Sequence, residues 1–302
     1  MDKIKIGIPR SINYYYYGNF LKNFFEKLGY EVIISNKTNK KILDDGIRYA
    51  NDEMCLAMKI YLGHIYDLKD KCDYILIPRI DNYGTYNQTC TNFLALYDIV
   101  NNLFNIKIID YNIDINNKED ELYSLCKLSS VLNKNRFEII KAYEYAKNKE
   151  EINLKKQSII NYNHLLSNKI KILLIAHSYI MYDEYIGKPI IDILKKQNIE
   201  IIYSDKFDHN LLNSLSKNYS ENLYWKFNRE NIGSISLVHN KIDGIIFLSS
   251  FPCGPDSIVN ELIMRKINKP YLNLVIDDID SLVGIETRIE SFVDILNEKN
   301  KI

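Results

Sequence analysis

The feature that most constrains the fold of this chain is an internal repeat of four strand-like segments. In the first copy the segments begin at Lys3, Glu31, Asp73 and Ile106. In the second copy they begin at Lys169, Glu200, Asp243 and Tyr271. The later segments start 28, 70 and 103 residues after Lys3, against 31, 74 and 102 residues after Lys169. Helix-like patterns separate them, and strands that alternate with helices indicate a parallel α/β sheet. The sequence therefore predicts two similar doubly wound Rossmann-like lobes.

A different segment separates the two copies. No glycine occurs between Gly84 and Gly187, and residues 119–166 are charged and helical in pattern. We expect a first lobe over residues 1–115, a helical connector over 116–168 and a second lobe over 169–302. The connector is expected to be a helical hairpin that packs on one lobe, and its pattern contains one apolar stripe. The stripe consists of Ile152, Ile159, Tyr162 and Leu166.

Composition excludes several classes of protein. Lys and Arg together number 39, as do Asp and Glu, so the neutral chain has no field to hold a nucleic-acid backbone. No run of about 18 apolar residues is present to span a membrane. The N-terminus lacks the apolar core of a signal peptide, which predicts a cytoplasmic protein. Five cysteines in such a chain do not indicate a disulfide framework.

Three cysteines fall where ligands bind in doubly wound sheets, near helix N-termini at the carboxyl ends of strands. Cys90 and Cys253 follow the third strand of each copy, and Cys55 opens another predicted helix. The helix dipole there favours a thiolate over a thiol. Cys72 directly precedes a strand and Cys126 lies within a helix, so we expect both to be packing residues.

Three converging thiolates suit a soft metal site. Zinc normally takes four ligands, whereas thiolate ligation also suits iron–sulfur clusters. The separations match neither ferredoxins nor zinc knuckles, because 34 residues lie between Cys55 and Cys90 and 162 between Cys90 and Cys253. From the residues alone, a metal site and buried or redox-active cysteines both remain open.

Other polar residues each have two interpretations. Arg10 and Arg79 follow Ile-Pro pairs and either face a cleft, where they stabilise a cluster or phosphate, or tie down helix ends. His177 is a fourth ligand, a proton donor or a satisfied loop histidine, and the last is expected. Tyr14–Tyr17 either line the cleft or pack, and packing is expected. Three aspartates superficially resemble a magnesium site, but a solvated loop is expected: Asp277, Asp278 and Asp280.

The surrounding motifs resemble a known family. In the first copy they are Gly7-Ile-Pro-Arg-Ser, Asn51-Asp-Glu-Met-Cys55, Gly63-His64, Tyr74-Ile-Leu-Ile-Pro-Arg79 and Thr89-Cys90-Thr-Asn-Phe. In the second they are Tyr182-Asp-Glu-Tyr-Ile-Gly-Lys-Pro, Phe251-Pro-Cys-Gly-Pro-Asp-Ser-Ile-Val-Asn-Glu and Gly284-Ile-Glu-Thr-Arg-Ile-Glu-Ser-Phe. Together they are similar to the cluster-bearing subunits of 2-hydroxyacyl-CoA dehydratases and to the activase-related domain of unknown function associated with them.

The resemblance implies an oxygen-sensitive [4Fe-4S] cluster, typical of anaerobes, in the cleft between the lobes. Cys55, Cys90 and Cys253 match the expected ligands, and one iron is left without a cysteine. In such systems a separate ATP-dependent activator supplies a low-potential electron, and this sequence has no P-loop of its own. A homologous cluster-bearing subunit or a second copy of the chain is the implied partner, and an acyl-CoA the implied substrate.

Two hypotheses therefore remain. In the first, the chain is an iron–sulfur redox protein, either a dehydratase-like lyase subunit or an electron-transfer accessory. In the second, it is a metal-free, two-lobed protein that binds a small molecule or acts as a scaffold.

Overall fold

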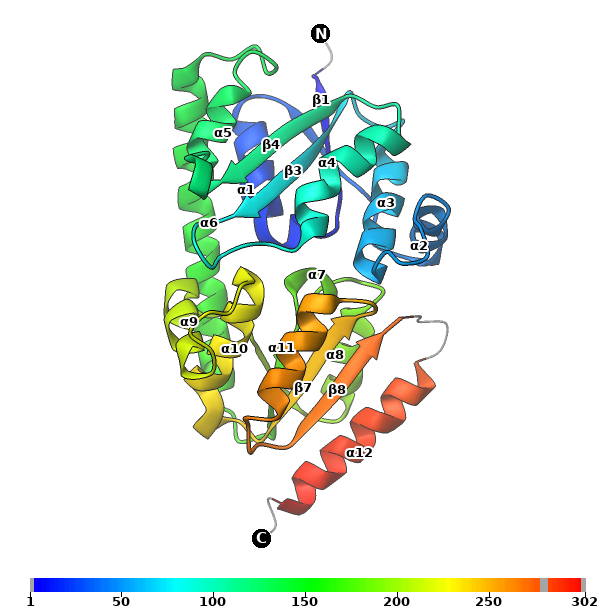
Figure 1. Cartoon of the computed structure of the whole chain (residues 1–302), viewed down its shortest axis with the longest axis vertical. Helices are drawn as coiled ribbons and strands as arrows, with labels where there is room; N and C mark the ends of the chain where they lie inside the picture. The colour runs from blue at the N-terminus through cyan, green and yellow to red at the C-terminus, as the bar shows by residue number, and fades with distance from the viewer. Residues whose placement is uncertain (1–2, 278–281, 300–302) are drawn as a thin grey trace. The chain divides into compact units, whose positions relative to one another are not determined.

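The computed structural model describes residues 3–277 and 282–299 and divides into two compact units, residues 1–153 and 154–302. Each unit contains one four-stranded parallel sheet with helices between the strands (Figure 1). The predicted α/β fold with two lobes is confirmed. The described residues include no helix that is long and apolar enough to cross a membrane.

The sheet of the first unit has the strand order β2-β1-β3-β4. Its strands are β1 (Lys5–Ile8), β2 (Glu31–Ile34), β3 (Tyr74–Asn82) and β4 (Ile108–Asp114). Its helices are α1 (Tyr14–Lys27), α2 (Lys40–Ile47), α3 (Leu56–Leu68), α4 (Thr91–Leu103) and α5 (Glu121–Lys127). The chain places β2 on one side of β1 and then β3 on the other. The gap between the carboxyl ends of β1 and β3 is therefore the topological switch point, where ligands bind in such sheets.

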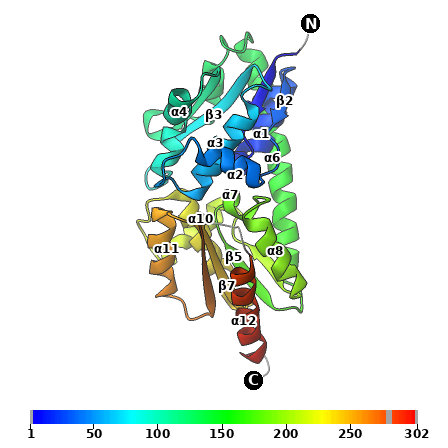
Figure 2. The ribbon, with the colours of Figure 1, turned by 90° about the vertical axis from the view of Figure 1, so that its right-hand side faces the viewer.

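Apolar burial explains the layers of the first unit. Helices α1 and α5 share one core with side chains of β1, β3 and β4, including Phe24, Leu125 and Tyr111. Helix α2 lies against α3 (Figure 2), where Gly63 lets the backbone of α3 come close to the carbonyl of Ile42. A Cβ built on Gly63 would lie 1.9 Å from that oxygen, so only glycine fits there.

The second unit repeats this topology with the order β6-β5-β7-β8. Its strands are β5 (Lys171–Ile175), β6 (Glu200–Tyr203), β7 (Gly244–Ser250) and β8 (Tyr271–Ile276). Its helices are α7 (Ser178–Met181), α8 (Gly187–Lys196), α9 (His209–Leu215), α10 (Lys226–Val238), α11 (Gly254–Met264) and α12 (Val283–Lys299). All seven residues of β7 are buried, as expected for a central strand covered on both faces.

Matching hydrogen bonds support the repeat. The Lys5 N–H donates to Asp73 Oδ2 at 2.8 Å, and the Lys171 N–H donates to Asp243 Oδ2 at 2.7 Å. In each case an aspartate just before the third strand holds the first residue of the first strand. The two units therefore share both their strand order and a local anchor.

Helix α6 (Arg136–His164) contributes residues to both units. Residues 116–153 group with the first unit and residues 154–168 with the second. The connector packs on the first lobe, as expected, because α5 and α6 both contribute buried residues to its core. The apolar stripe is not the part that packs. Ile152, Ile159 and Leu166 are 59, 61 and 80% exposed, whereas the Tyr162 ring contacts Phe207.

The buried face of α6 is a different one. Ile139, Ala142 and Ala146 belong to the core of the first unit. The small side chains of these alanines let α6 approach the core closely. The helical spacing of the apolar stripe shows that its residues share one side of the helix, but it does not show which side is buried.

Candidate functional site

Three of the five cysteines occupy the same structural position, the N-cap of a helix. Cys55 precedes α3, Cys90 precedes α4 and Cys253 precedes α11. Each has an extended backbone conformation and makes no side-chain capping bond to its helix. The sequence prediction that these cysteines lie at helix N-termini is confirmed. The positive end of each helix dipole favours the thiolate form.

In the first unit, a side chain from the helix that Cys90 precedes contacts Cys55. The Asn92 side chain, in the first turn of α4, donates from Nδ2 to Cys55 Sγ over 3.8 Å. The N-termini of α3 and α4 therefore lie beside each other, and both thiols are partly buried. The buried Thr89 holds the loop before Cys90, because its hydroxyl and its N–H both bond to the Asp81 carbonyl.

Cys253 has different neighbours in the second unit. Asp256, in the first turn of α11, accepts a hydrogen bond from the Cys253 thiol. Its Oδ1 also lies 2.9 Å from His177 Nε2 and accepts a bond of 2.7 Å from Asn228 Nδ2. Burial alone would raise the pKa of Asp256, but the charge of His177 and these hydrogen bonds lower it. The carboxylate is therefore ionised beside the third cysteine.

His177 itself is a satisfied residue, as predicted. It is the N-cap of α7, at the carboxyl end of β5, and its side chain is 6% exposed. Its ring stacks on Tyr179 with centroids 4.9 Å apart. The bond to Asp256 holds its Nε2 in place.

A second buried cluster surrounds Glu230 on α10. Its carboxylate bonds to Lys226 Nζ and lies 3.0 Å from His209 Nδ1. Burial raises the pKa of Glu230, but Lys226 and His209 lower it below its usual value. Burial lowers the pKa of His209, but the bond to Glu230 raises it above its usual value.

Cys72 and Cys126 are packing residues, as predicted. Cys72 Sγ donates to the Leu68 carbonyl at 3.3 Å and lies against Gly7. Burial raises the pKa of Cys72 to about 11, which leaves it an unreactive thiol. Cys126 lies within α5 and packs against the core of the first unit. None of the five cysteines, all within the described residues, forms a disulfide.

Arg10 and Arg79 both bond inside the first unit. Arg10 donates from its backbone N–H and from Nε to Ser35, and its guanidinium lies 5.4 Å from the Tyr14 ring centre. Arg79 lies in β3, 3.5 Å from Asp98. These contacts favour the structural interpretation of both arginines.

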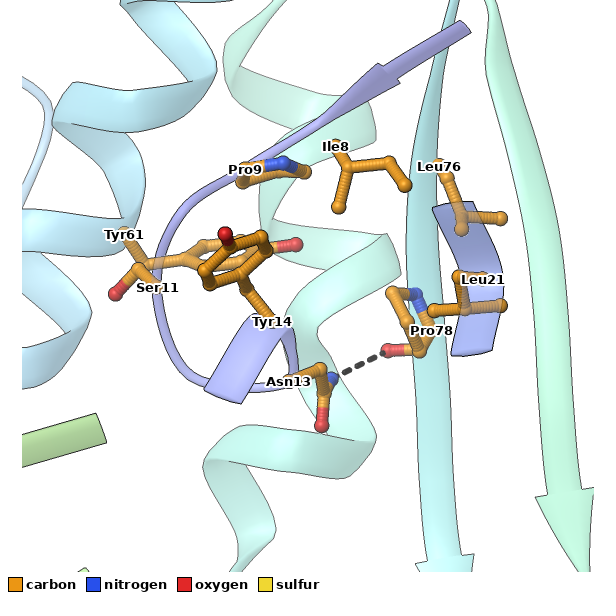
Figure 3. Close-up of a pocket in the computed structure, with 9 residues that line it drawn as sticks. All are labelled: Ile8, Pro9, Ser11, Asn13, Tyr14, Leu21, Tyr61, Leu76 and Pro78. Carbon is orange, nitrogen blue, oxygen red and sulfur yellow. Dashed lines mark hydrogen bonds between the residues drawn. The ribbon is translucent and has the colours of Figure 1, made fainter. Parts of the chain in front are cut away.

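A small pocket lies at the switch point of the first unit (Figure 3). Its lining residues carry no charge and are Ile8, Pro9, Ser11, Asn13, Tyr14, Leu21, Tyr61, Leu76 and Pro78. The Tyr61 side chain enters from α3, and its hydroxyl points into the pocket. That hydroxyl has no hydrogen-bond partner among the described residues. Of the four predicted tyrosines, Tyr14 lines this pocket.

Within residues 3–277 and 282–299, no group of three or more His, Cys, Asp or Glu side chains could hold a metal ion. Each unit contributes fewer than three of the predicted cysteine ligands, two in the first and one in the second. Of the aspartates weighed as a magnesium site, Asp278 and Asp280 lie outside the described residues.

Sequence reasoning missed two polar neighbours of the cysteines. Asn92 was visible only as part of the motif around Cys90, and nothing in the sequence marked it as a contact of Cys55. Asp256 was visible only as part of the motif around Cys253, and its bonds to His177 and Asn228 depend on residues far away in the chain. The only signal in the sequence for these two residues was that each lies two or three positions after a candidate cysteine, Asn92 after Cys90 and Asp256 after Cys253.

Two solved structures are similar over most of the chain. The first is described as "structure of Cd-bound periplasmic metal binding protein from candidatus liberibacter asiaticus", with 11% identity and a TM-score of 0.30, covering 97% of this chain and 99% of that one. The second is "Crystal structure of ZnuA", with 12% identity and a TM-score of 0.29, covering 98 and 99%. These values are too low to assign metal binding to this chain. No match was found among curated proteins.

One protein-family model matches residues 5–207, about two thirds of the chain. It is described as "CoA enzyme activase uncharacterised domain (DUF2229)". The matched range includes Cys55 and Cys90 and ends before Cys253. This confirms the predicted relation to activase-associated proteins of CoA-dehydratase systems. The chain belongs to the family of the CoA enzyme activase uncharacterised domain (DUF2229).

Proposed function

We propose that this chain binds a [4Fe-4S] cluster through Cys55, Cys90 and Cys253. We further propose that it acts in low-potential electron transfer or radical dehydration with a separate ATP-dependent activator. The observation that carries the proposal is the shared N-cap position of these three cysteines, against the packing positions of Cys72 and Cys126. Thiolates at helix N-termini suit an anionic iron–sulfur centre.

Two of the three proposed ligands, Cys55 and Cys90, lie in the first unit. Both residues are partly buried rather than fully enclosed. Asn92 keeps the two helix ends together and presents an N–H to one sulfur. When bound, the cluster would supply one-electron chemistry at low potential, with one iron not held by a cysteine.

The family description supports an activator as partner. This sequence has no P-loop, so ATP hydrolysis in this proposal belongs to another protein. A homologous cluster-bearing subunit or a second copy of this chain is the proposed assembly partner. An acyl-CoA is the proposed substrate if the chain is part of a dehydratase.

The test is cluster assembly in cysteine variants purified without oxygen. Cys55→Ala, Cys90→Ala and Cys253→Ala should each lose most of the protein-bound iron and sulfide. The Cys72→Ala variant is the matched control, because it removes a thiol from the same unit without removing a proposed ligand. Full iron content in all three ligand variants would refute the proposal.

The second candidate is a metal-free protein that binds a small molecule. The topological switch point of the parallel sheet in the first unit, where ligands bind in such folds, favours it. It predicts a colourless protein that takes up no iron after chemical reconstitution under anaerobic conditions. A stoichiometric iron–sulfur chromophore would exclude it.

A further inference from the structure

We propose that the exposed side of α6 is a docking surface for a second copy of this chain, which it binds as a parallel two-stranded coiled coil. The inference deepens one part of the proposed function, the assembly partner. It does not depend on a bound cluster, so the state of association and the iron content can be measured separately on the same protein.

The surface is a row of large side chains along α6, a single helix of 29 residues. Tyr145, Ile152 and Ile159 follow one another at intervals of seven residues and are 40, 59 and 61% exposed. Seven residues are close to two helical turns, so the three side chains lie in a row, called here the α6 stripe. Large side chains repeated every seven residues are typical of one seam position in a coiled coil.

Packing inside the chain leaves the α6 stripe exposed because α6 buries another side. Ile139, Ala142 and Ala146 belong to the core of the first unit. Successive residues of a helix are about 100° apart, which places the stripe on a different side of α6 from these three residues. A long helix that presents a second apolar row to solvent indicates a partner for that row.

Charged residues flank the α6 stripe in the order that a parallel pair of helices requires. Glu144 and Glu151 each stand directly before a stripe residue, and Lys149 and Lys156 stand five residues after these glutamates. All four residues are exposed. In a parallel coiled coil, the residue directly before a seam position faces the residue five positions later on the other helix. Each glutamate of one copy therefore faces a lysine of the other copy.

The same charges identify both the orientation and the occupant. In an antiparallel pair the glutamates of the two helices would face each other, and so would the lysines, which is unfavourable. A helix that carries both members of each ion pair is complementary to a second copy of itself. Lys149 Nζ already lies beside the stripe, 5.8 Å from the ring centre of Tyr145. The polar Asn148 and Lys155 lie between the stripe residues, and polar seam residues fix the register at a cost in stability, so we expect a weak dimer.

The test is the mass of the full chain, measured by sedimentation equilibrium. The unmodified protein should pass from 35.5 kDa towards twice that mass as its concentration is raised over about a hundredfold range. Ile152→Lys should raise the dissociation constant at least about tenfold, because it puts like charges into the seam. This side chain is more than half exposed, so the fold of the single chain does not depend on it.

Two charge variants decide whether the ion pairs form. The first carries Glu144→Lys with Glu151→Lys, and the second carries Lys149→Glu with Lys156→Glu. Each variant alone should lose association, because all its facing charges are alike. An equal mixture of the two should associate again, because the lysines of one chain then face the glutamates of the other. Misfolded variants would not recover in this way, and circular dichroism checks the fold of each.

The control is Lys195→Glu with Lys196→Glu, two exposed lysines of α8. It changes the net charge as much as the second charge variant and should associate like the unmodified protein. A chain that stays monomeric at every concentration overturns the inference. Association that Ile152→Lys leaves unchanged, or a mixture of folded charge variants that stays monomeric, also overturns it. None of these results bears on the iron content, by which the proposed function is tested.

Discussion

The hydroxyl of Tyr61 gives the sharpest stability prediction for the first unit. Tyr61 is 1% exposed, and its hydroxyl has no hydrogen-bond partner among the described residues. Burial raises the pKa of Tyr61 far above its usual value, so the group is a neutral hydroxyl. The pocket in Figure 3 into which it points is lined by uncharged residues, among them the apolar Ile8 and Leu76. A hydroxyl buried in this way costs free energy that a phenylalanine would not.

The magnitude follows from the cost of desolvation. A buried polar group without a partner costs about 1–3 kcal/mol, and deleting one oxygen atom loses only a few dispersion contacts. Tyr61→Phe should therefore stabilise the first unit by about 1 kcal/mol. With a urea m value of about 2 kcal/mol/M, the midpoint of unfolding should rise by about 0.5 M.

The assay is equilibrium urea unfolding with two probes. Far-ultraviolet circular dichroism follows both units, whereas the single tryptophan, Trp225, reports on the second unit alone. Only the transition of the first unit should move. Tyr30→Phe is the matched control, because the Tyr30 hydroxyl donates to the Leu132 carbonyl and its loss should destabilise by about 1 kcal/mol. If Tyr61→Phe lowers the midpoint as Tyr30→Phe does, the Tyr61 hydroxyl is satisfied in the folded protein and the reasoning is refuted.

Three further substitutions test the energetics of the fold. Glu230→Gln should destabilise the second unit by about 2 kcal/mol near neutral pH, because it removes the charged partner of the partly buried Lys226 and His209. The lowered pKa of Glu230 gives stability that is lost as pH falls from the ordinary pKa of that carboxyl through its lowered folded value. The raised pKa of His209 gives stability that is lost as pH rises from the ordinary pKa of the imidazole through its raised folded value. Unfolding free energies measured from pH 4 to 8 should therefore peak at intermediate pH, and a variant as pH-sensitive as the parent would contradict this. Gly63→Ala should destabilise by several kcal/mol, because its methyl group would meet the Ile42 carbonyl, and an unchanged melting temperature would count against that contact. Gly284→Ala should stabilise α12 by about 0.5–1 kcal/mol, because no atom lies within 4 Å of the added methyl group; a lower melting temperature would contradict that.

The sheets could be predicted because buried parallel strands appear as short apolar runs at regular spacing. The run from Asp73 to Pro78 and its counterpart after Asp243 correspond to β3 and β7. Strand ends were harder to predict. β3 continues to Asn82 although Arg79, Asp81 and Asn82 interrupt the apolar run, since the strand stays paired with β4 over that part.

The candidate site was predictable to the extent that it depends on local structure. The N-cap positions of Cys55, Cys90 and Cys253 follow from the start of each helix, which turn and cap residues mark in the sequence. The bond from Asn92 to Cys55 joins residues 37 apart, and the pair of His177 and Asp256 depends on the order of the strands. Such contacts between residues far apart in the chain form only when the sheet has formed, so the periodicity of the sequence does not predict them.

The connector shows the reverse case. Its stripe of large apolar side chains suggested a buried face, yet Ile152 and Leu166 are exposed. The covered face is the one with Ala142 and Ala146. Periodicity identified a helix correctly, but close packing against a sheet depends on side-chain size as much as on hydrophobicity.

The central claim is that Cys55, Cys90 and Cys253 hold an iron–sulfur cluster. It is tested most directly by counting iron and sulfide in protein expressed with added iron and purified without oxygen. The proposal predicts about four irons and four sulfides per chain, with broad visible absorption, in the unmodified protein and in Cys72→Ala. A colourless protein that takes up no iron after chemical reconstitution would contradict it.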